Sequence, residues 1–87
     1  ELIGQMDIKP NPFQNRIDIA FELAEKTQMS VEVRDIQGKL IKTLASGEYP
    51  VGAQQFTWDG TTLPDGVYLV FLCTEKGSIA KRMVKVR

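Results

Sequence analysis

Histidine is absent from this chain of 87 residues, and cysteine occurs only once, as Cys73. Without histidine the commonest general base is missing, and no imidazole can activate a serine or cysteine nucleophile. With neither histidine nor a cysteine pair, the usual zinc sites are excluded and no internal disulfide can form. The residue inventory therefore argues against an enzyme and against a metal or cofactor site.

Net charge and long apolar runs are also lacking. Eleven acidic residues balance eleven basic ones, so no overall field steers the chain toward nucleic acid or a membrane. No apolar run reaches the length of a membrane-spanning helix, and no signal peptide is recognisable. The chain starts without methionine, which suggests a segment of a longer polypeptide. Its length suits one small domain that folds alone with little margin.

Two aspartates, Asp59 and Asp65, are the carboxylates that a site could use. Each precedes a glycine, and Asp-Gly pairs are typical of turns. Calcium binding in this loop is the alternative, but the alternating aspartate spacing of a calcium loop is missing. We therefore interpret both residues as turn formers.

Apolar and polar residues alternate in segments that recur about every ten residues. The inward rows of the first two such segments are Ile17, Ile19, Phe21 and Leu23, and then Met29, Val31 and Val33. The second segment is expected to run to Ile36, and residues 35–38 to form a turn with Gly38 at positive φ. Further strands are expected at 39–45, 54–59, 67–74 and 79–86, with a longer loop at 46–52 and a lead-in or edge strand at 2–8. No segment has a helical period. The pattern predicts an all-β, Ig-like antiparallel β-sandwich of about seven strands.

The stretch from Phe56 to Phe71 reads as a strand, a tight connection and a second strand. We expect these two strands to be the central pair of the fold. Trp58, the only tryptophan, is the largest candidate for the core. Pro64-Asp65-Gly66 has the chemistry of a turn, in which proline presets φ and Gly66 takes a positive φ.

The strand from Val67 to Cys73 is apolar on both faces, although a sandwich strand needs only one buried row. We assign Tyr68 and the residues alternating with it to the core, because a tyrosine just after a Pro-x-Gly corner resembles a tyrosine corner. The other row is Leu69, Phe71 and Cys73. These residues are either covered by flanking side chains or form a contact patch for a partner.

The closing strand is basic. Lys81, Lys85 and Arg87 share one face if the strand is regular, with Met83 among them. On physical grounds alone this is a solvated face that discourages edge-to-edge aggregation.

The order of several short motifs resembles a known family. These motifs are Pro10-Asn11-Pro12-Phe13, residues 33–38 (Val-Arg-Asp-Ile-Gln-Gly), Trp58-Asp59-Gly60, Gly66-Val67-Tyr68 and residues 81–85 (Lys-Arg-Met-Val-Lys). Their order and spacing from Ile8 to Arg87 are similar to the type A C-terminal sorting domain of the type IX (Por) secretion system. Hook-cap proteins of flagella have a similar Ig-like domain, which supports the fold but not the function.

This resemblance implies that residues 1–87 are one sorting domain, with 1–8 a lead-in that contains or adjoins a processing site. It implies a secretion signal that a type IX outer-membrane translocon reads and a sortase-like surface peptidase removes. The passenger would precede the domain in the same chain, pass through the periplasm, and end at the outer-membrane surface or be secreted. The signal residues implied are Gly66, Tyr68, Lys81, Arg82 and Lys85.

Two functions from different classes compete. The first is this non-catalytic secretion signal, and the alternative is an accessory Ig-like adhesion or carbohydrate-binding module of a surface enzyme. A sorting domain ends its parent and leaves the mature product, whereas a binding module persists. No nucleic acid partner is expected, and a weak homodimer through the Leu69, Phe71 and Cys73 patch is left open.

Overall fold

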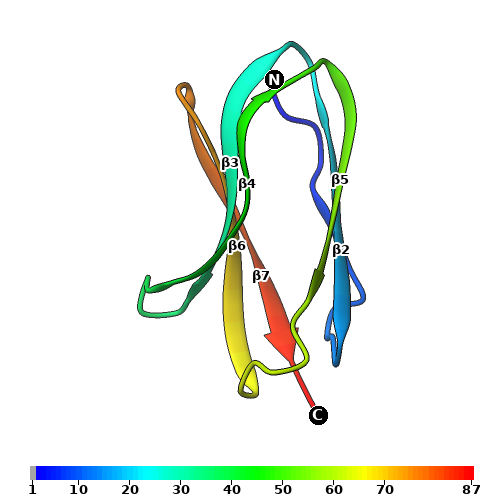
Figure 1. Cartoon of the computed structure of the whole chain (residues 1–87), viewed down its shortest axis with the longest axis vertical. Helices are drawn as coiled ribbons and strands as arrows, with labels where there is room; N and C mark the ends of the chain where they lie inside the picture. Colours follow the sequence, from blue (N-terminus) through cyan, green and yellow to red (C-terminus); the bar gives the residue numbers. More distant parts are fainter. Residues whose placement is uncertain (1) are drawn as a thin grey trace.

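The computed structural model describes residues 2–87, which form seven strands and no helix (Figure 1). The strands are β1 (Asp7–Lys9), β2 (Arg16–Leu23), β3 (Thr27–Asp35), β4 (Leu40–Tyr49), β5 (Gly52–Asp59), β6 (Gly66–Thr74) and β7 (Gly77–Lys85). They make a three-stranded sheet in the order β1-β2-β5 and a four-stranded sheet in the order β4-β3-β6-β7. All named strand pairs are antiparallel. The predicted seven-stranded Ig-like sandwich is confirmed.

The core lies between the two sheets and is built from the alternating rows of the strands. The predicted inward rows of β2 and β3 are buried, and so are Tyr68, Val70 and Leu72 of β6. Phe13, which lies in the loop before β2, has no exposed surface and fills one end of the core. Because each strand side chain points to the opposite face from its neighbour, one apolar row per strand is enough to fill this interior.

The expectation that the strands on either side of the Asp59–Gly66 connection form a central pair is wrong. β5 is an edge strand that pairs only with β2, whereas β6 lies inside the other sheet between β3 and β7. The connection between them therefore crosses from one sheet to the other. Trp58, on the edge strand β5, is correspondingly only partly buried, and it is not the centre of the core.

Two strand limits also differ from those expected. The loop predicted at 46–52 is largely strand, because β4 continues through Gly47 to Tyr49 and only Pro50 and Val51 separate it from β5. Gly47 stays in the strand with a φ of 144°. At the end of β3, Ile36 lies outside the strand and is 70% exposed.

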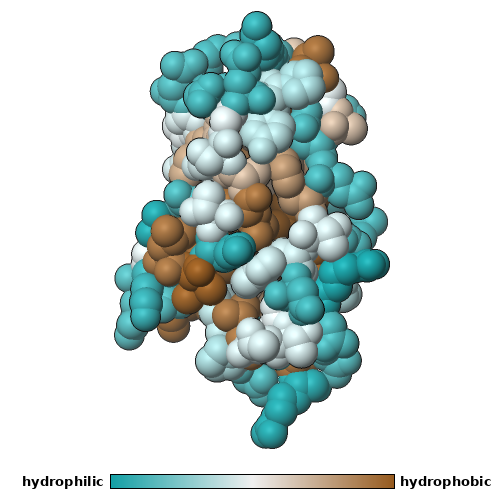
Figure 2. Space-filling model, viewed as in Figure 1, coloured by the Kyte–Doolittle hydropathy of each residue, from teal (hydrophilic) through white to brown (hydrophobic). Residues whose placement is uncertain are grey.

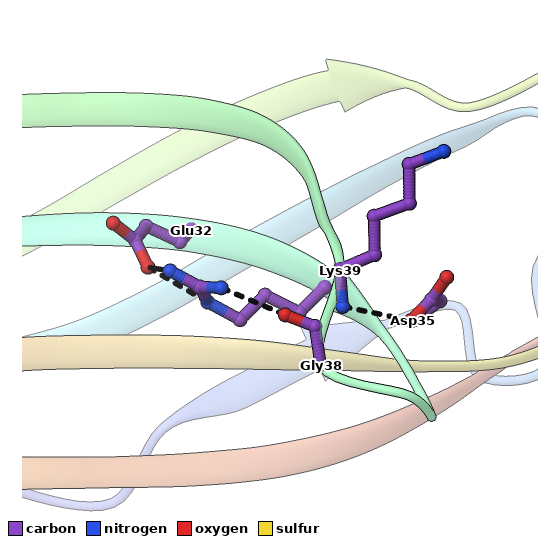
Figure 3. A network of polar contacts seen from close by, with 5 residues as sticks. Glu32, Asp35, Gly38 and Lys39 are labelled. Carbon is purple, nitrogen blue, oxygen red and sulfur yellow. Dashed lines mark hydrogen bonds and ion pairs between the residues drawn. The ribbon is translucent and has the colours of Figure 1, made fainter.

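The β3–β4 turn follows its sequence closely (Figure 3). The Asp35 carboxylate accepts hydrogen bonds from the backbone N–H groups of Gln37 and Lys39, both at 2.9 Å. Gly38 has a φ of 89°, as the turn prediction requires, and its carbonyl accepts a 2.8 Å bond from the Arg34 guanidinium. Asp35 and Gly38 thus fix the reversal of the chain between the two strands.

No segment among residues 2–87 is a helix long and apolar enough to cross a membrane.

Candidate functional site

Four of the five predicted signal residues fall in one row across two neighbouring strands. β6 and β7 pair so that Gly66 lies opposite Lys85, Tyr68 opposite Met83, and Val70 opposite Lys81. Tyr68, Met83 and Lys85 are buried, so this row faces the inside of the sandwich. Arg82 belongs to the other face, opposite Leu69, and it is exposed.

The corner before β6 is held by the Tyr68 hydroxyl, which donates a 2.7 Å hydrogen bond to the carbonyl oxygen of Pro64. This is the predicted tyrosine corner. Burial, and then the negative charges of Asp35 and Asp65, raise the pKa of the Tyr68 hydroxyl above its ordinary value. The hydroxyl therefore stays protonated and can donate this bond over the whole neutral range. Gly66 has a φ of 153°, the positive value predicted for it.

The interpretation of the basic face as solvated is wrong for Lys85. This side chain is only 5% exposed, and its Nζ donates a 3.2 Å hydrogen bond to the carbonyl oxygen of Leu63. Leu63 immediately precedes Pro64, the acceptor of the Tyr68 hydroxyl. Lys85 and Tyr68 therefore donate hydrogen bonds to two consecutive carbonyls of the same corner.

Lys81 makes a similar link at the other end of the row. Its half-buried side chain donates a 2.7 Å hydrogen bond from Nζ to the carbonyl oxygen of Met6. Met6 is separated from Lys81 by 75 positions in the chain and lies in the lead-in just before β1. The first basic residue of the closing strand is thus attached to the segment where processing was expected.

The last part of the β7 edge is covered by residues 11–13. Asn11 Nδ2 donates to the Arg82 carbonyl at 3.1 Å, and Asn11 Oδ1 accepts from the Val84 N–H at 3.0 Å. The Phe13 N–H donates a 2.8 Å hydrogen bond to the Val84 carbonyl, and the Phe13 carbonyl accepts a 2.9 Å hydrogen bond from the Val86 N–H. We call this edge, where residues 6–14 contact β7, the closed seam. The role of Asn11 was not predicted.

Comparison with known proteins decides the family. The family model of the secretion system C-terminal sorting domain matches residues 7–86. The chain belongs to this family. The sorting domain therefore has the role of a C-terminal secretion signal of the type IX system, which leads to the outer-membrane surface or to secretion.

The chain is also similar to two proteins of known sequence and to one solved structure. The basal-body rod modification proteins FlgD of Salmonella typhimurium and Salmonella typhi are 33% identical over 55 residues, 58% of the sorting domain and 24% of their own length. The sorting domain thus matches about a quarter of these curated relatives. Dimeric latent PorU from Porphyromonas gingivalis is similar with a TM-score of 0.69 at 20% identity, over 93% of this chain and 9% of PorU. This likeness shows the fold alone.

The outer row of β6 is half-buried in the sorting domain. The Arg34 guanidinium lies over the Phe71 ring, 5.9 Å from its centroid, and a 2.8 Å bond from this guanidinium to the Glu32 carboxylate holds it there. Leu69 and Cys73 are also half-buried, and Cys73 is a free thiol. Flanking side chains thus cover part of this row.

The chemistry of the site is that of recognition and shape. Its buried polar groups already hold one another, through the corner and the closed seam, while Arg82 and Arg87 present guanidinium groups to solvent. Arg87, whose side chain is 91% exposed, lies 3.7 Å from a carboxylate oxygen of Asp65. Among residues 2–87 no three Cys, Asp or Glu side chains gather as a metal site would require.

Proposed function

We propose that this domain carries a passenger protein, joined before it in the same chain, from the periplasm through the type IX translocon. A sortase-like surface peptidase then removes the domain, in or next to residues 1–8, as the passenger is attached to the surface. The domain itself performs no catalytic step. The observation that carries this proposal is the row of Gly66, Tyr68, Lys81 and Lys85 across β6 and β7, with Arg82 exposed beside it.

Within the signal, four of the five residues have one of two kinds of role. Tyr68 and Lys85 hold the corner at Leu63 and Pro64, and Lys81 holds the lead-in. These inward groups shape the basic strand rather than touch the translocon. Arg82 is the exposed group that the translocon contacts, because a guanidinium on the strand surface is free to pair with a carboxylate of the partner.

A reporter fused in front of residues 1–87 in a type IX-competent cell tests the proposal. The reporter should reach the surface, and it should arrive there without the domain. Arg82→Glu should reduce export several-fold and leave uncleaved fusion in the periplasm, while the melting temperature of the purified chain holds. An exposed substitution of this kind normally changes stability by no more than about 0.5 kcal/mol.

The matched control is Lys39→Glu, which makes the same change of charge in the β3–β4 turn. The Lys39 side chain points away from the polar network there (Figure 3). This variant should be exported like the parent. Equal export of both variants would remove Arg82 from the signal, and failure of the parent fusion to leave the periplasm would overturn the proposed function itself.

A further inference from the structure

The four sheet edges of the sandwich are not equally protected. The C-terminal half of β7 is covered by the closed seam, and β1 is only three residues long, with charged residues at both ends and Pro10 next to it. β4 is irregular, because its pairing with β3 shifts register twice. β5 pairs with β2 over eight residues without a shift, and among residues 2–87 no strand pairs with its other edge.

The sequence of β5 lacks the usual protection of an open edge. Natural edge strands carry lysine, proline, bulges or inward charges that discourage pairing with another chain. β5 has none of these. Its outward residues are Ala53, Gln55 and Thr57, and its only charge is Asp59 at the very end. Its backbone therefore offers a regular, uncharged ladder of donors and acceptors.

The apolar interior also reaches the surface beside this edge. Large side chains packed against the core but only partly buried line β4, β5 and the loop that follows, namely Ile41, Leu44, Tyr49, Phe56, Trp58 and Leu63. Figure 2 shows apolar atoms in the middle of this face of the molecule. We call this edge, between β4 and β5, the open seam. One more strand beside β5 would cover part of it.

We propose that a second copy of this chain occupies the edge, with the two β5 strands paired antiparallel about a two-fold axis. Directly opposed residues of an antiparallel pair point to the same face of the sheet. The two sandwiches therefore lie on the same side of the joined sheet only if inward residues of one β5 strand oppose inward residues of the other. Centring the pair on Phe56 meets this condition. It sets Phe56 opposite Phe56, an aromatic cross-strand pair, with Gln54 opposite Trp58 on the seam face and Gln55 opposite Thr57 on the outer face.

The occupant is a second copy because β5 is complementary to itself. In the Phe56-centred register Asp59 lies opposite Ala53, so no like charges meet, and the chain as a whole carries no net charge that would separate two copies. The contact uses the same strand of both copies, so it is isologous and gives a closed dimer. The other three edges are less suited to pairing, because β7 is partly covered, β1 is short and β4 is irregular. The outer row of β6 is less suitable, since Arg34 already covers Phe71.

Sedimentation equilibrium of the 87-residue chain tests for this dimer. A single strand pair buries less than the roughly 1,200–2,000 Å² of a standard interface, so the association should be weak. The average mass should rise from 9.8 kDa toward twice that value as protein is raised from about 10 µM to about 1 mM. A constant mass of one chain over this range would overturn the proposal.

Two double variants test the register. Gln55→Lys with Thr57→Lys sets lysine opposite lysine twice, whereas Gln55→Glu with Thr57→Lys sets glutamate opposite lysine twice. Both contain the same change at Thr57, which lies beside Asp18 of β2, so they differ only in the charge at position 55. The dissociation constant of the first should exceed that of the second by about tenfold or more.

Circular dichroism melting of both variants controls for folding. Equal dissociation constants for the two, or loss of the dimer in both, would overturn the Phe56-centred pairing. Leu69→Asp is the counter-test for the outer row of β6. It should leave the dimer intact, and if it abolishes the dimer, the contact runs through the Leu69, Phe71 and Cys73 patch and not through β5.

Discussion

The two long edges of the sandwich are built in opposite ways. At the closed seam, residues 6–14 reach β7 through backbone bonds of Phe13, both polar atoms of the Asn11 amide, and the Lys81 ammonium. At the open seam, β4 and β5 are joined only through the short turn at Pro50 and Val51, and no backbone hydrogen bond links the two strands in the described chain. The closed seam unites the two ends of the sequence, and the open seam leaves apolar side chains partly exposed.

The comparison shows why the motifs of this family occur at both ends of the chain. Pro10–Phe13 and the basic residues 81–85 lie far apart in the sequence but form one structural unit at the closed seam. Loss of either segment leaves hydrogen-bonding groups of the other segment without their partners. The signal motif is therefore also a part of the fold, and recognition and stability have to be separated by experiment.

The largest difference between the seams should appear on truncation of their aromatic residues. Phe13 has no exposed surface, so Phe13→Ala removes a complete core side chain, which typically costs about 3–5 kcal/mol. That loss is a large share of the total free energy of unfolding of a small domain, which is about 5–15 kcal/mol. Trp58→Ala should cost less, because the Trp58 ring is only partly buried.

Urea unfolding of both variants, followed by far-ultraviolet circular dichroism, gives the two free energies. Circular dichroism serves here because Trp58→Ala removes the only tryptophan fluorophore. If Trp58→Ala proves the more damaging of the two, the open seam is closed in solution and the contrast between the seams fails.

A smaller effect is expected from the lysines. Lys85→Met keeps most of the buried volume but removes the donor of the part-buried Leu63 carbonyl, so the cost should lie toward the lower end of the about 1–3 kcal/mol of an unsatisfied buried acceptor. Lys81→Met should cost less, because Lys81 is only half-buried and solvent can reach its end of the row. The matched control is Lys42→Met on β4, an exposed lysine next to the open seam, which should stay within about 0.5 kcal/mol of the parent.

Thermal and urea unfolding of the three methionine variants would rank them. Stability of Lys85→Met equal to or above that of the parent would show that the buried ammonium costs as much in desolvation as its hydrogen bond returns. In that case Lys85 would not stabilise the corner, and the Tyr68 hydroxyl alone would hold it at Pro64.

Local patterns predicted the parts of the fold that depend on local geometry. The inward rows of β2 and β3 and the Asp35–Gly38 turn follow from the two-residue period of a strand and from the conformational freedom of glycine. The tyrosine corner also lies within a few residues, from Pro64 to Tyr68. In each case the residues that make the structure are neighbours in the sequence.

The features that were missed depend on distant partners. The burial of Lys85 needs the Leu63 carbonyl, 22 positions away, and the partial exposure of Trp58 follows from the place of β5 at the edge of a sheet. Gly47 was expected to lie in a loop, but it pairs with Met29 and continues the strand. Sheet assignment is a property of the whole chain, and β5 lacks the lysine, proline or bulge that marks many edge strands.

The smallest expected effect concerns the corner that adjoins the closed seam. Tyr68→Phe removes the bond from the Tyr68 hydroxyl to Pro64 and should cost about 0.5–1.5 kcal/mol at neutral pH. The folded state raises the pKa of this hydroxyl and so favours its neutral form. The stability that it contributes is therefore complete below the ordinary tyrosine pKa of about 10, and it is lost as the pH rises through the higher pKa of the folded state.

The difference in unfolding free energy between the parent and Tyr68→Phe isolates the contribution of the Tyr68 hydroxyl, because every other ionisable group is present in both proteins. The difference should be constant from about pH 6 to about pH 9 and should shrink above about pH 10. A difference that does not change with pH would mean that the hydroxyl ionises equally in both states. The bond to Pro64 would then contribute nothing to the corner, and Lys85 alone would hold it at Leu63.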